Sequence, residues 1–262
     1  MIRTDYVFGN SKCKVLALAI HNGHDMPEKL LENCGIDEAT RLREEDPHTG
    51  SIAALFENHI IVHDSRFMID INRVIQDSVY QDPDDCWGLK ARKNPISLDY
   101  LFELHSMHKA WYDVLKYQLD RILQFQPQIL LLDLHSYNYR RQGAGMPEDD
   151  PTLNPDIILG RSNLHPKYYP LIEKLRSRLD GLNWQGRALD CRCDVKFSGG
   201  YLSRWINSTY PDRAVCLAVE FKKVWMDEWS GKLFEPGFSE LKRHFYKQFS
   251  DFCKADLSGR FS

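Results

Sequence analysis

Three side chains that can do chemistry each stand at the end of an apolar run: His21, His135 and Glu220. Short apolar runs fit buried strands, and the ligands of open α/β sheets bind at the carboxyl ends of the strands. A lone histidine there is more often a hydrogen-bonded loop residue, and a lone glutamate is usually solvated. Because all three recur at equivalent places, they predict a metal site with two imidazole ligands and a general base.

A third protein ligand would complete an open catalytic site, which keeps one position for water. His24 lies three residues after His21 in a turn that contains Gly23, so both imidazoles could reach one ion. A polar wall or a substrate contact explains His24 equally well. The run 44–46, Glu-Glu-Asp, offers three carboxylates. Its alternative is a solvated acidic helix end, and composition alone favours that alternative.

The segment 65–73 carries groups suited to binding a carboxylate. Arg66 and Arg73 flank an alternating stretch, and Asn72 sits beside the second arginine. A guanidinium donates two parallel hydrogen bonds to a carboxylate, and an adjacent amide adds a third donor. The alternative is a surface ion pair between Asp70 and Arg73, which would contribute little to stability.

Apolar runs and amphipathic spacing predict the elements that must position these groups. The predicted strands follow the runs Lys14–Ile20, Ile60–Val62 with Phe67–Ile69 after it, Ile129–Leu132, Ile157–Gly160 and Ala214–Val219. The predicted helices are Leu98–Phe125, Tyr168–Leu182 and Phe238–Phe252. Buried strands alternating with covering helices predict an α/β sandwich, with a mixed, mostly parallel sheet flanked by helices, as a single domain over residues 1–262.

Two long loops, residues 81–95 and 137–155, are rich in Pro, Asp and Asn. Long loops in compact α/β domains are disproportionately functional. The second loop carries a cationic patch, Arg140 and Arg141, shortly after His135. This patch adds to the basic groups expected around the site.

Composition places the chain among ordinary globular proteins. Its 262 residues are 43% hydrophobic and 27% charged, and 34 basic against 37 acidic residues give a net charge of -3. No nucleic-acid or membrane partner is expected from this balance, and no apolar run approaches the roughly 20 residues needed to span a bilayer. Seven scattered cysteines and an N-terminus without a signal peptide predict a cytoplasmic protein with reduced thiols. The oligomeric state does not follow from the sequence.

Five motifs resemble those of the N-formylglutamate amidohydrolases and occur in the same order. They are His21-Asn22-Gly23, Asp70-Ile71-Asn72-Arg73, Asp133-Leu134-His135-Ser136, Gly199-Gly200-Tyr201 and Ala218-Val219-Glu220. The second and third motifs at this separation are a strong signal, whereas either alone is weak. That family is similar in fold to the zinc carboxypeptidases and the aspartoacylase-like deacylases, and the likeness runs from about residue 15 to about residue 230.

The resemblance implies a phosphorylase/hydrolase-like sheet of about eight strands and one zinc ion (Zn2+). His21 and His135 would be zinc ligands. The carboxypeptidase relatives place a glutamate three residues after the first histidine, where this chain has His24. Asp46 occupies the place of an acidic residue typical of the formylglutamate family. The resemblance therefore favours Asp46 as the third ligand, ahead of Glu45 and His24.

The same resemblance implies roles around the metal. Glu220 would take a proton from the attacking water and pass it to the leaving amine. Asn72 and Arg73 would hold the substrate's carboxylate, and Arg66 would assist them or polarise the scissile carbonyl. The remaining expected substrate-binding residues are Ser136, Arg140, Gly199 and Gly200. The two glycines would let the backbone approach the substrate closely.

The activity expected from these residues is zinc-dependent hydrolysis of an N-acyl amide on a small acidic amino acid such as N-formylglutamate. One rival is a metallocarboxypeptidase-like enzyme that removes a C-terminal acidic residue from a peptide. A second rival is a catalytically inactive binding protein of the same fold, because fold does not fix function. The presence of His21, His135 and Glu220 together counts against this second rival.

Overall fold

The computed structural model describes residues 1–10 and 12–257. Seven strands of this part of the chain form one sheet in the order β1-β3-β2-β4-β9-β5-β8. Their bounds are β1 Thr4–Phe8, β2 Val15–Ala19, β3 Asn58–Val62, β4 Ile129–Tyr137, β5 Ile157–Gly160, β8 Cys191–Cys193 and β9 Ala214–Lys222. Two further strands, β6 Asn183–Trp184 and β7 Arg187–Ala188, pair only with each other.

The sheet is parallel in its middle and mixed at its edges. Strands β3, β2, β4 and β9 run in the same direction. Strand β1 is antiparallel to β3, and β5 is antiparallel to β9. The mixed, mostly parallel α/β sheet predicted from the apolar runs is therefore confirmed, and it has seven strands in the described part of the chain where the resemblance implied about eight.

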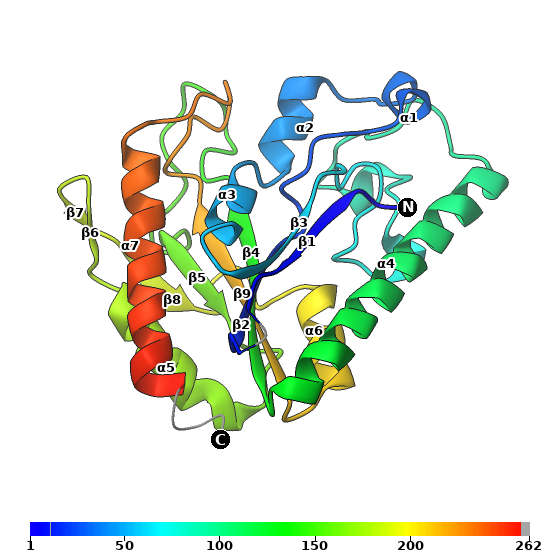
Figure 1. Ribbon diagram of the computed structural model, residues 1–262. Helices are drawn as coiled ribbons and strands as arrows, with labels where there is room; N and C mark the ends of the chain where they lie inside the picture. The colour runs from blue at the N-terminus through cyan, green and yellow to red at the C-terminus, as the bar shows by residue number, and fades with distance from the viewer. Residues whose placement is uncertain (11, 258–262) are drawn as a thin grey trace.

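Helices cover both faces of the sheet (Figure 1). Their bounds are α1 Glu28–Glu32, α2 Glu38–Glu44, α3 Thr49–Ala53, α4 Leu98–Phe125, α5 Tyr169–Leu179, α6 Tyr201–Thr209 and α7 Gly237–Phe252. Short 3-10 turns occupy Ile75–Asp77, Pro83–Asp85 and Pro166–Tyr168, and a π-helical turn Cys253–Leu257 follows α7. Helices α4 and α6 bury apolar side chains on one face, and α3, α5 and α7 do so on the other.

The predicted helices are confirmed with small shifts at their ends. Helix α4 has the predicted bounds because the Ser97 side chain caps its first turn by accepting from the Tyr100 N–H. Helix α5 ends at Leu179, before Leu182, because the next residue is extended and Gly181 then takes a φ of 76°. The run Phe67–Ile69 is a turn and not a strand.

Two central strands continue past their apolar runs. Strand β4 passes through His135 to Tyr137, and β9 passes through Glu220 to Lys222. His135 and Glu220 are register partners in this parallel pair. The expectation that the strands end at these residues is thus wrong, because the backbone ladder continues where the apolar sequence stops. The extension brings an imidazole and a carboxylate onto neighbouring strands.

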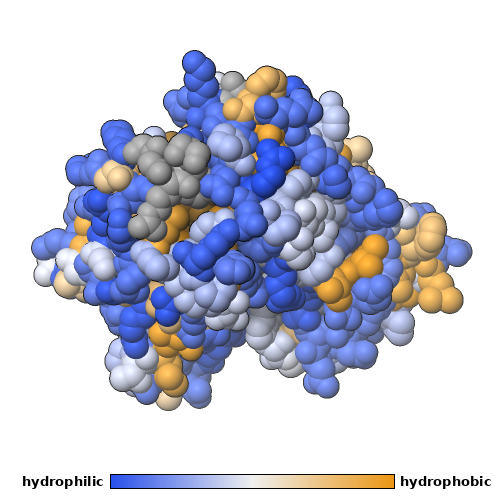
Figure 2. Space-filling model, turned by 90° about the horizontal axis from the view of Figure 1, so that it is seen from below, coloured by the Kyte–Doolittle hydropathy of each residue, from blue (hydrophilic) through white to orange (hydrophobic). Residues whose placement is uncertain are grey.

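The opposite end of the molecule, where the parallel strands begin, is seen in Figure 2. Its surface is mainly hydrophilic and carries separate apolar patches, as is normal for a folded protein. Among the described helices, none is both long and apolar enough to cross a bilayer.

Candidate active site

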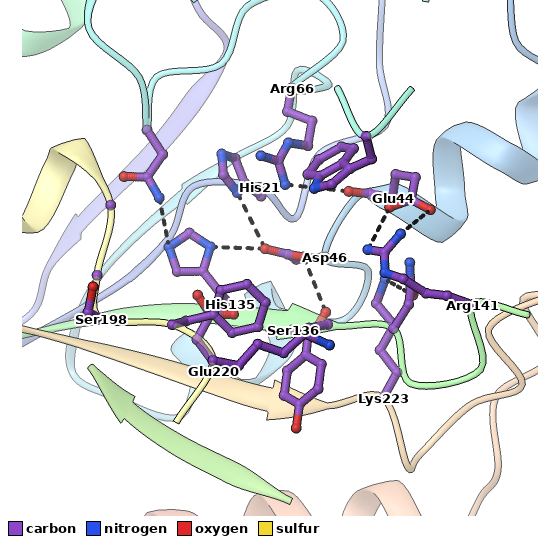
Figure 3. A pocket seen from close by; sticks show the side chains of 18 residues that line it. His21, Glu44, Asp46, Arg66, His135, Ser136, Arg141, Ser198, Glu220 and Lys223 are labelled. Carbon is purple, nitrogen blue, oxygen red and sulfur yellow. Dashed lines mark hydrogen bonds and ion pairs between the residues drawn. The ribbon is translucent and has the colours of Figure 1, made fainter. Parts of the chain in front are cut away.

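A cavity of about 320 Å³ opens at the carboxyl ends of the central parallel strands. Strands β4 and β9 form its floor, and the segment after α2 forms part of its wall (Figure 3). Residues from the loops 66–72, 138–141 and 196–200, together with Trp87, form further parts of the wall. Residues from all five motifs line it, including His21, Asn72, His135, Gly200 and Glu220. The topology therefore gathers segments that are far apart in the sequence around one cavity.

His21, Asp46 and His135 converge at the base of this cavity. Asp46 Oδ2 lies 3.4 Å from His21 Nδ1 and 3.0 Å from His135 Nδ1. All three residues are buried, and one ligand atom from each lies within 4.8 Å of the others. Figure 3 shows Asp46 between the two imidazoles. Two imidazole nitrogens and a carboxylate oxygen at this spacing could hold a metal ion.

Both histidines present Nδ1 to this centre and Nε2 to a second carboxylate. His21 Nε2 donates to Asp70 Oδ1 at 2.7 Å, and His135 Nε2 lies 2.9 Å from Asp133 Oδ1. Carboxylates in this position fix the ring orientation and tautomer of metal-ligating histidines. Among the described residues, His21 Nδ1 is buried without a hydrogen-bond partner. An orphaned nitrogen that faces a carboxylate oxygen and a second imidazole fits a metal cation.

The charges around the centre favour a cation there. Burial raises the pKa of Asp46, but the hydrogen bond from His135 and the nearby imidazole of His21, 3.4 Å away, outweigh it and hold the pKa below the usual value. Burial lowers the pKa of His135, but the charge of Asp133 and the hydrogen bond to Asp46 raise it well above the usual value. The site thus stabilises positive charge between these groups. A divalent ion satisfies the same preference, since its ligands bind deprotonated.

The local backbone explains how Asp46 reaches the centre. Helix α2 ends at Glu44, and the Asp46 N–H donates to the His21 carbonyl at 2.9 Å. Buried Lys223 donates from Nζ to the carbonyls of Arg43 and Glu45 and to Asn138 Oδ1. These bonds use all three ammonium hydrogens. Lys223 therefore ties the segment after α2 to the end of β9.

The other two candidates for the third ligand pair with each other. The Glu45 carboxylate accepts from His24 Nδ1 and from Ser65 Oγ, and Glu45 is fully buried. The hydrogen bond to Glu45 raises the pKa of His24. Of the described residues, neither belongs to the group that could hold a metal. Since Glu44, Glu45 and Asp46 are all buried, the interpretation of this run as a solvated helix end is wrong.

Glu220 lies beside the metal candidates on the cavity floor. It is the register partner of His135 and lines the same cavity. Burial raises the pKa of Glu220 to about 7, while the charge of His135 opposes this and that of Asp46 adds to it. A carboxylate with a pKa near neutrality suits a general base.

Arg66 and Asn72 line the cavity and are both held in place. Arg66 donates from Nε to the Tyr80 hydroxyl at 3.1 Å and from Nη2 to Asp70 Oδ2 at 2.7 Å. Asn72 Nδ2 lies 3.4 Å from His135 Nε2. The Asn72 side chain thus reaches the metal candidates, whereas most of the Arg66 donors are used within the wall.

Arg73, unlike its neighbour Asn72, does not line the cavity. Its Nε is 3.9 Å from Asp70 Oδ2, and its guanidinium lies 5.2 Å from the centre of the Tyr80 ring. Asp70 has no exposed surface and also contacts His21 and Arg66. The alternative of an ion pair between Asp70 and Arg73 is thus confirmed at a long distance, but its placement at the surface is wrong because Asp70 is buried. Asp70 is a buried carboxylate that organises the site.

Of the remaining expected substrate-binding residues, three line the cavity and one does not. Ser136 lines the cavity and donates from Oγ to Asp46 Oδ1 at 3.3 Å. Gly199 and Gly200 line it as well, and a Cβ on Gly200 would lie 2.3 Å from the Asn72 side chain. Gly200 therefore allows the backbone to pass close to Asn72. Arg140 is outside the lining and donates to Asp227 Oδ2 at 2.6 Å.

Arg141 of the expected cationic patch and Glu44 of the acidic run both line the cavity. Other lining residues were not predicted from the sequence, among them Trp87, Lys196, Phe197 and Lys223. Trp87 comes from the first long loop, and Arg66 lies 4.8 Å from the centre of its ring. The first long loop was the available signal for Trp87. Lys223 and Lys196 carry no local pattern that separates them from surface lysines.

Comparisons with known proteins agree with the five motifs. The sequence matches the N-formylglutamate amidohydrolase family over residues 13–225, and no curated protein matches it. The crystal structure of N-formylglutamate amidohydrolase from Ralstonia eutropha JMP134 is similar with a TM-score of 0.75 and 15% identity, over 99% of this chain and 100% of that chain. A gene product from Agrobacterium tumefaciens is similar over 95% of each chain, with a TM-score of 0.59 and 15% identity. Because the family match spans most of the sequence, the chain belongs to the N-formylglutamate amidohydrolase family.

Proposed function

We propose that this protein is a zinc-dependent amidohydrolase that cleaves the N-acyl amide of a small acidic amino acid, such as N-formylglutamate. The observation that carries the proposal is the buried group His21, Asp46 and His135 with Glu220 beside it in one cavity. Membership of the family supports hydrolysis of a linear amide. A cavity of about 320 Å³ suits a small substrate.

The metal-binding residues in this proposal are His21, Asp46 and His135, with the two rings oriented by Asp70 and Asp133. When bound, zinc would supply Lewis-acid activation of a water and of the acyl carbonyl. Three protein ligands leave a coordination position open, which is the arrangement of catalytic rather than structural zinc sites.

The proton transfers fall to Glu220. Its carboxylate would accept a proton from the attacking water and deliver it to the amide nitrogen as the C–N bond breaks. Arg66 on the cavity wall would polarise the acyl carbonyl and stabilise the negative charge that develops on its oxygen. Asn72 and the backbone at Gly199 and Gly200 would contact the substrate beside the metal.

We also propose a cytoplasmic location. The seven cysteines are free thiols, and none is joined in a disulfide within the described residues. Reduced thiols are typical of the cytoplasm.

The test is turnover of N-formyl, N-acetyl and N-succinyl derivatives of glutamate and aspartate by the zinc-loaded protein. We expect release of the free amino acid from at least one of these amides, and loss of that activity after treatment with a chelator. Release of a C-terminal glutamate from a peptide, without cleavage of any N-acyl amino acid, would replace the proposal with a carboxypeptidase. Zinc binding without either activity would leave a binding protein.

A further inference from the structure

Two cations at the mouth of the cavity, Arg141 and Lys196, have no role in the chemistry proposed above. Arg141 lies on the loop after β4, and Lys196 lies on the segment after β8; both line the cavity. The Arg141 side chain is 38% exposed, and Lys196 is exposed. Both side chains line the same cavity as Glu220 and His135. Burial and the charge of Arg141 lower the pKa of Lys196, as expected for two cations that line one cavity.

Arg141 pairs with Glu44, but the contacts are long and Arg43 shares the same carboxylate. Its Nη1 and Nη2 lie 3.4 Å and 3.2 Å from the Glu44 carboxylate. The same carboxylate also accepts from Arg43 Nε at 3.2 Å. One carboxylate therefore serves two guanidinium groups, and both Arg141 bonds are longer than the 2.7–2.9 Å typical of charge-assisted pairs. Arg141 keeps donors for another acceptor.

Lys196 has a neutral partner. Its Nζ donates to Asn154 Oδ1 at 2.7 Å and lies 5.0 Å from the centre of the Tyr137 ring. Within the described part of the chain, no carboxylate lies at ion-pairing distance from Lys196. The acidic Glu228 nearby already accepts from the backbone N–H groups of Tyr139 and Arg140. Two of the three ammonium hydrogens of Lys196 thus remain for a ligand.

The other basic groups around the cavity have fewer donors left to bind an anionic group of a ligand. Arg66 directs its donors to Tyr80 and Asp70, and Lys223 uses its three hydrogens on protein acceptors. Arg73 lies outside the lining. Among the described residues that line the cavity, Arg141 and Lys196 are therefore the cations that keep donors for a ligand.

We propose that Arg141 and Lys196 form an anion subsite that binds the side-chain carboxylate of an N-acyl amino dicarboxylate. This inference rests on the proposed function, because it takes the acyl amide to lie at the His21, Asp46 and His135 group. Arg141 would give up part of its contact with Glu44 and donate to the substrate, and Lys196 would donate from Nζ. The subsite would make the enzyme prefer a glutamate over a glutamine side chain of the same size.

The test compares kcat/KM for N-formylglutamate and N-formylglutamine with the zinc-loaded protein and the variants Arg141→Gln and Lys196→Gln. We expect the kcat/KM of wild type to be at least about tenfold higher for the glutamate substrate. A hydrogen bond to a charged group contributes enough free energy to change kcat/KM by that factor. Each variant should lose most of this preference by slowing the glutamate substrate alone. Arg121→Gln and Lys247→Gln remove the same charges from helix surfaces outside the cavity and should keep the preference. Thermal unfolding checks that every variant folds.

The outcomes separate the subsite from the proposed function. Equal hydrolysis of the two substrates by wild type overturns the subsite and leaves the function standing. Loss of the preference in Arg73→Gln, with Arg141→Gln unaffected, overturns the subsite and assigns the carboxylate to Arg73. If neither substrate is cleaved, the proposed function fails. Calorimetry of L-glutamate and L-glutamine binding then tests whether the anion subsite exists. A glutamate preference that Arg141→Gln removes supports it, and equal binding overturns it.

Discussion

Asp46 and Asp156 each stand at the centre of a buried cluster, and the two clusters differ in how completely their polar groups are paired. Asp156 accepts from Arg187 Nη1 and Nη2 at 2.7 Å and 2.8 Å and from the Asp190 N–H at 3.0 Å, and Lys222 Nζ lies 3.2 Å away. Around Asp46, by contrast, His21 Nδ1 has no hydrogen-bond partner among the described residues. Asp133 Oδ1 lies 2.9 Å from His135 Nε2, and its other oxygen is buried without a hydrogen-bond partner among the described residues.

Both clusters draw on the same strand. Strand β9 supplies Glu220 to the cavity and, two residues later, Lys222 to the cluster of Asp156. A buried polar atom without a partner costs folding free energy, so it persists where it serves another purpose. The closed cluster of Asp156 fits a structural role. The open cluster of Asp46 leaves an atom available for a ligand.

The largest effect is expected from Glu220→Gln in the open cluster. The amide keeps the shape of the side chain but cannot accept the proton of the attacking water. We expect kcat for the N-acyl substrate to fall by about 10²–10⁴-fold. Zinc content measured by elemental analysis should stay at the wild-type level, because Glu220 is not a proposed ligand. Unchanged turnover would place the base elsewhere, and loss of zinc would make Glu220 a ligand.

A smaller effect is expected from Asp133→Asn, which alters the carboxylate behind His135. Without the negative charge, His135 is held less firmly in the tautomer that presents Nδ1 to the metal. We expect zinc affinity, measured by competition with a chromophoric chelator, to fall by about 10–100-fold. Asp156→Asn is the matched control from the closed cluster. Equal losses of zinc affinity in the two variants would show that the comparison between the clusters is wrong.

A substitution in the closed cluster of Asp156 should lower the free energy of unfolding without changing zinc affinity or kcat. Asp156→Asn weakens the pairs with Arg187 and Lys222, and we expect the free energy of unfolding at pH 7 to fall by roughly 1–3 kcal/mol. The lower end is expected because the Arg187 side chain is 43% exposed, where solvent screens the pair. Denaturant unfolding measures this loss, while zinc affinity and kcat should match wild type. A catalytic defect in a stably folded variant would contradict the assignment.

The ion pairs of Asp156 also make the stability of the folded state depend on pH. Burial raises the pKa of Asp156, but hydrogen bonds from Arg187 and Asp190 and the charge of Lys222 bring it below its usual value. A carboxyl with a depressed pKa stabilises the folded state above its unfolded pKa, near 3.9, and loses that contribution as the pH falls through its folded value. The stability gap between wild type and Asp156→Asn should therefore be full at pH 7 and shrink below about pH 4. A constant gap between pH 7 and pH 3 would contradict this origin.

The sequence was sufficient for the features that depend on local pattern. Apolar runs located the central strands, and helical spacing gave α4 its bounds. His21, His135 and Glu220 stood out because each interrupts an apolar run. Strand β1 escaped prediction because it alternates between partly buried and exposed residues and carries a short, mixed sequence.

The features that depend on long-range contacts could not be predicted. The acidic run around Asp46 reads as a solvated surface, and only the fold shows that Lys223 and His21 hold it in the interior. Arg140 and Arg141 are adjacent and chemically equivalent, yet one binds Asp227 and the other lines the cavity. Nothing in their local sequence distinguishes these two fates.

The most direct test of the open cluster is a zinc titration of metal-free wild type, His135→Ala and His24→Ala by isothermal calorimetry. The two variants each remove one imidazole near the same segment, but His24 pairs with Glu45 whereas His135 faces Asp46. We predict one tight zinc site in wild type and in His24→Ala, and none in a folded His135→Ala. Tight binding that survives in His135→Ala, or disappears in His24→Ala, would contradict the assignment of the metal centre to His21, Asp46 and His135.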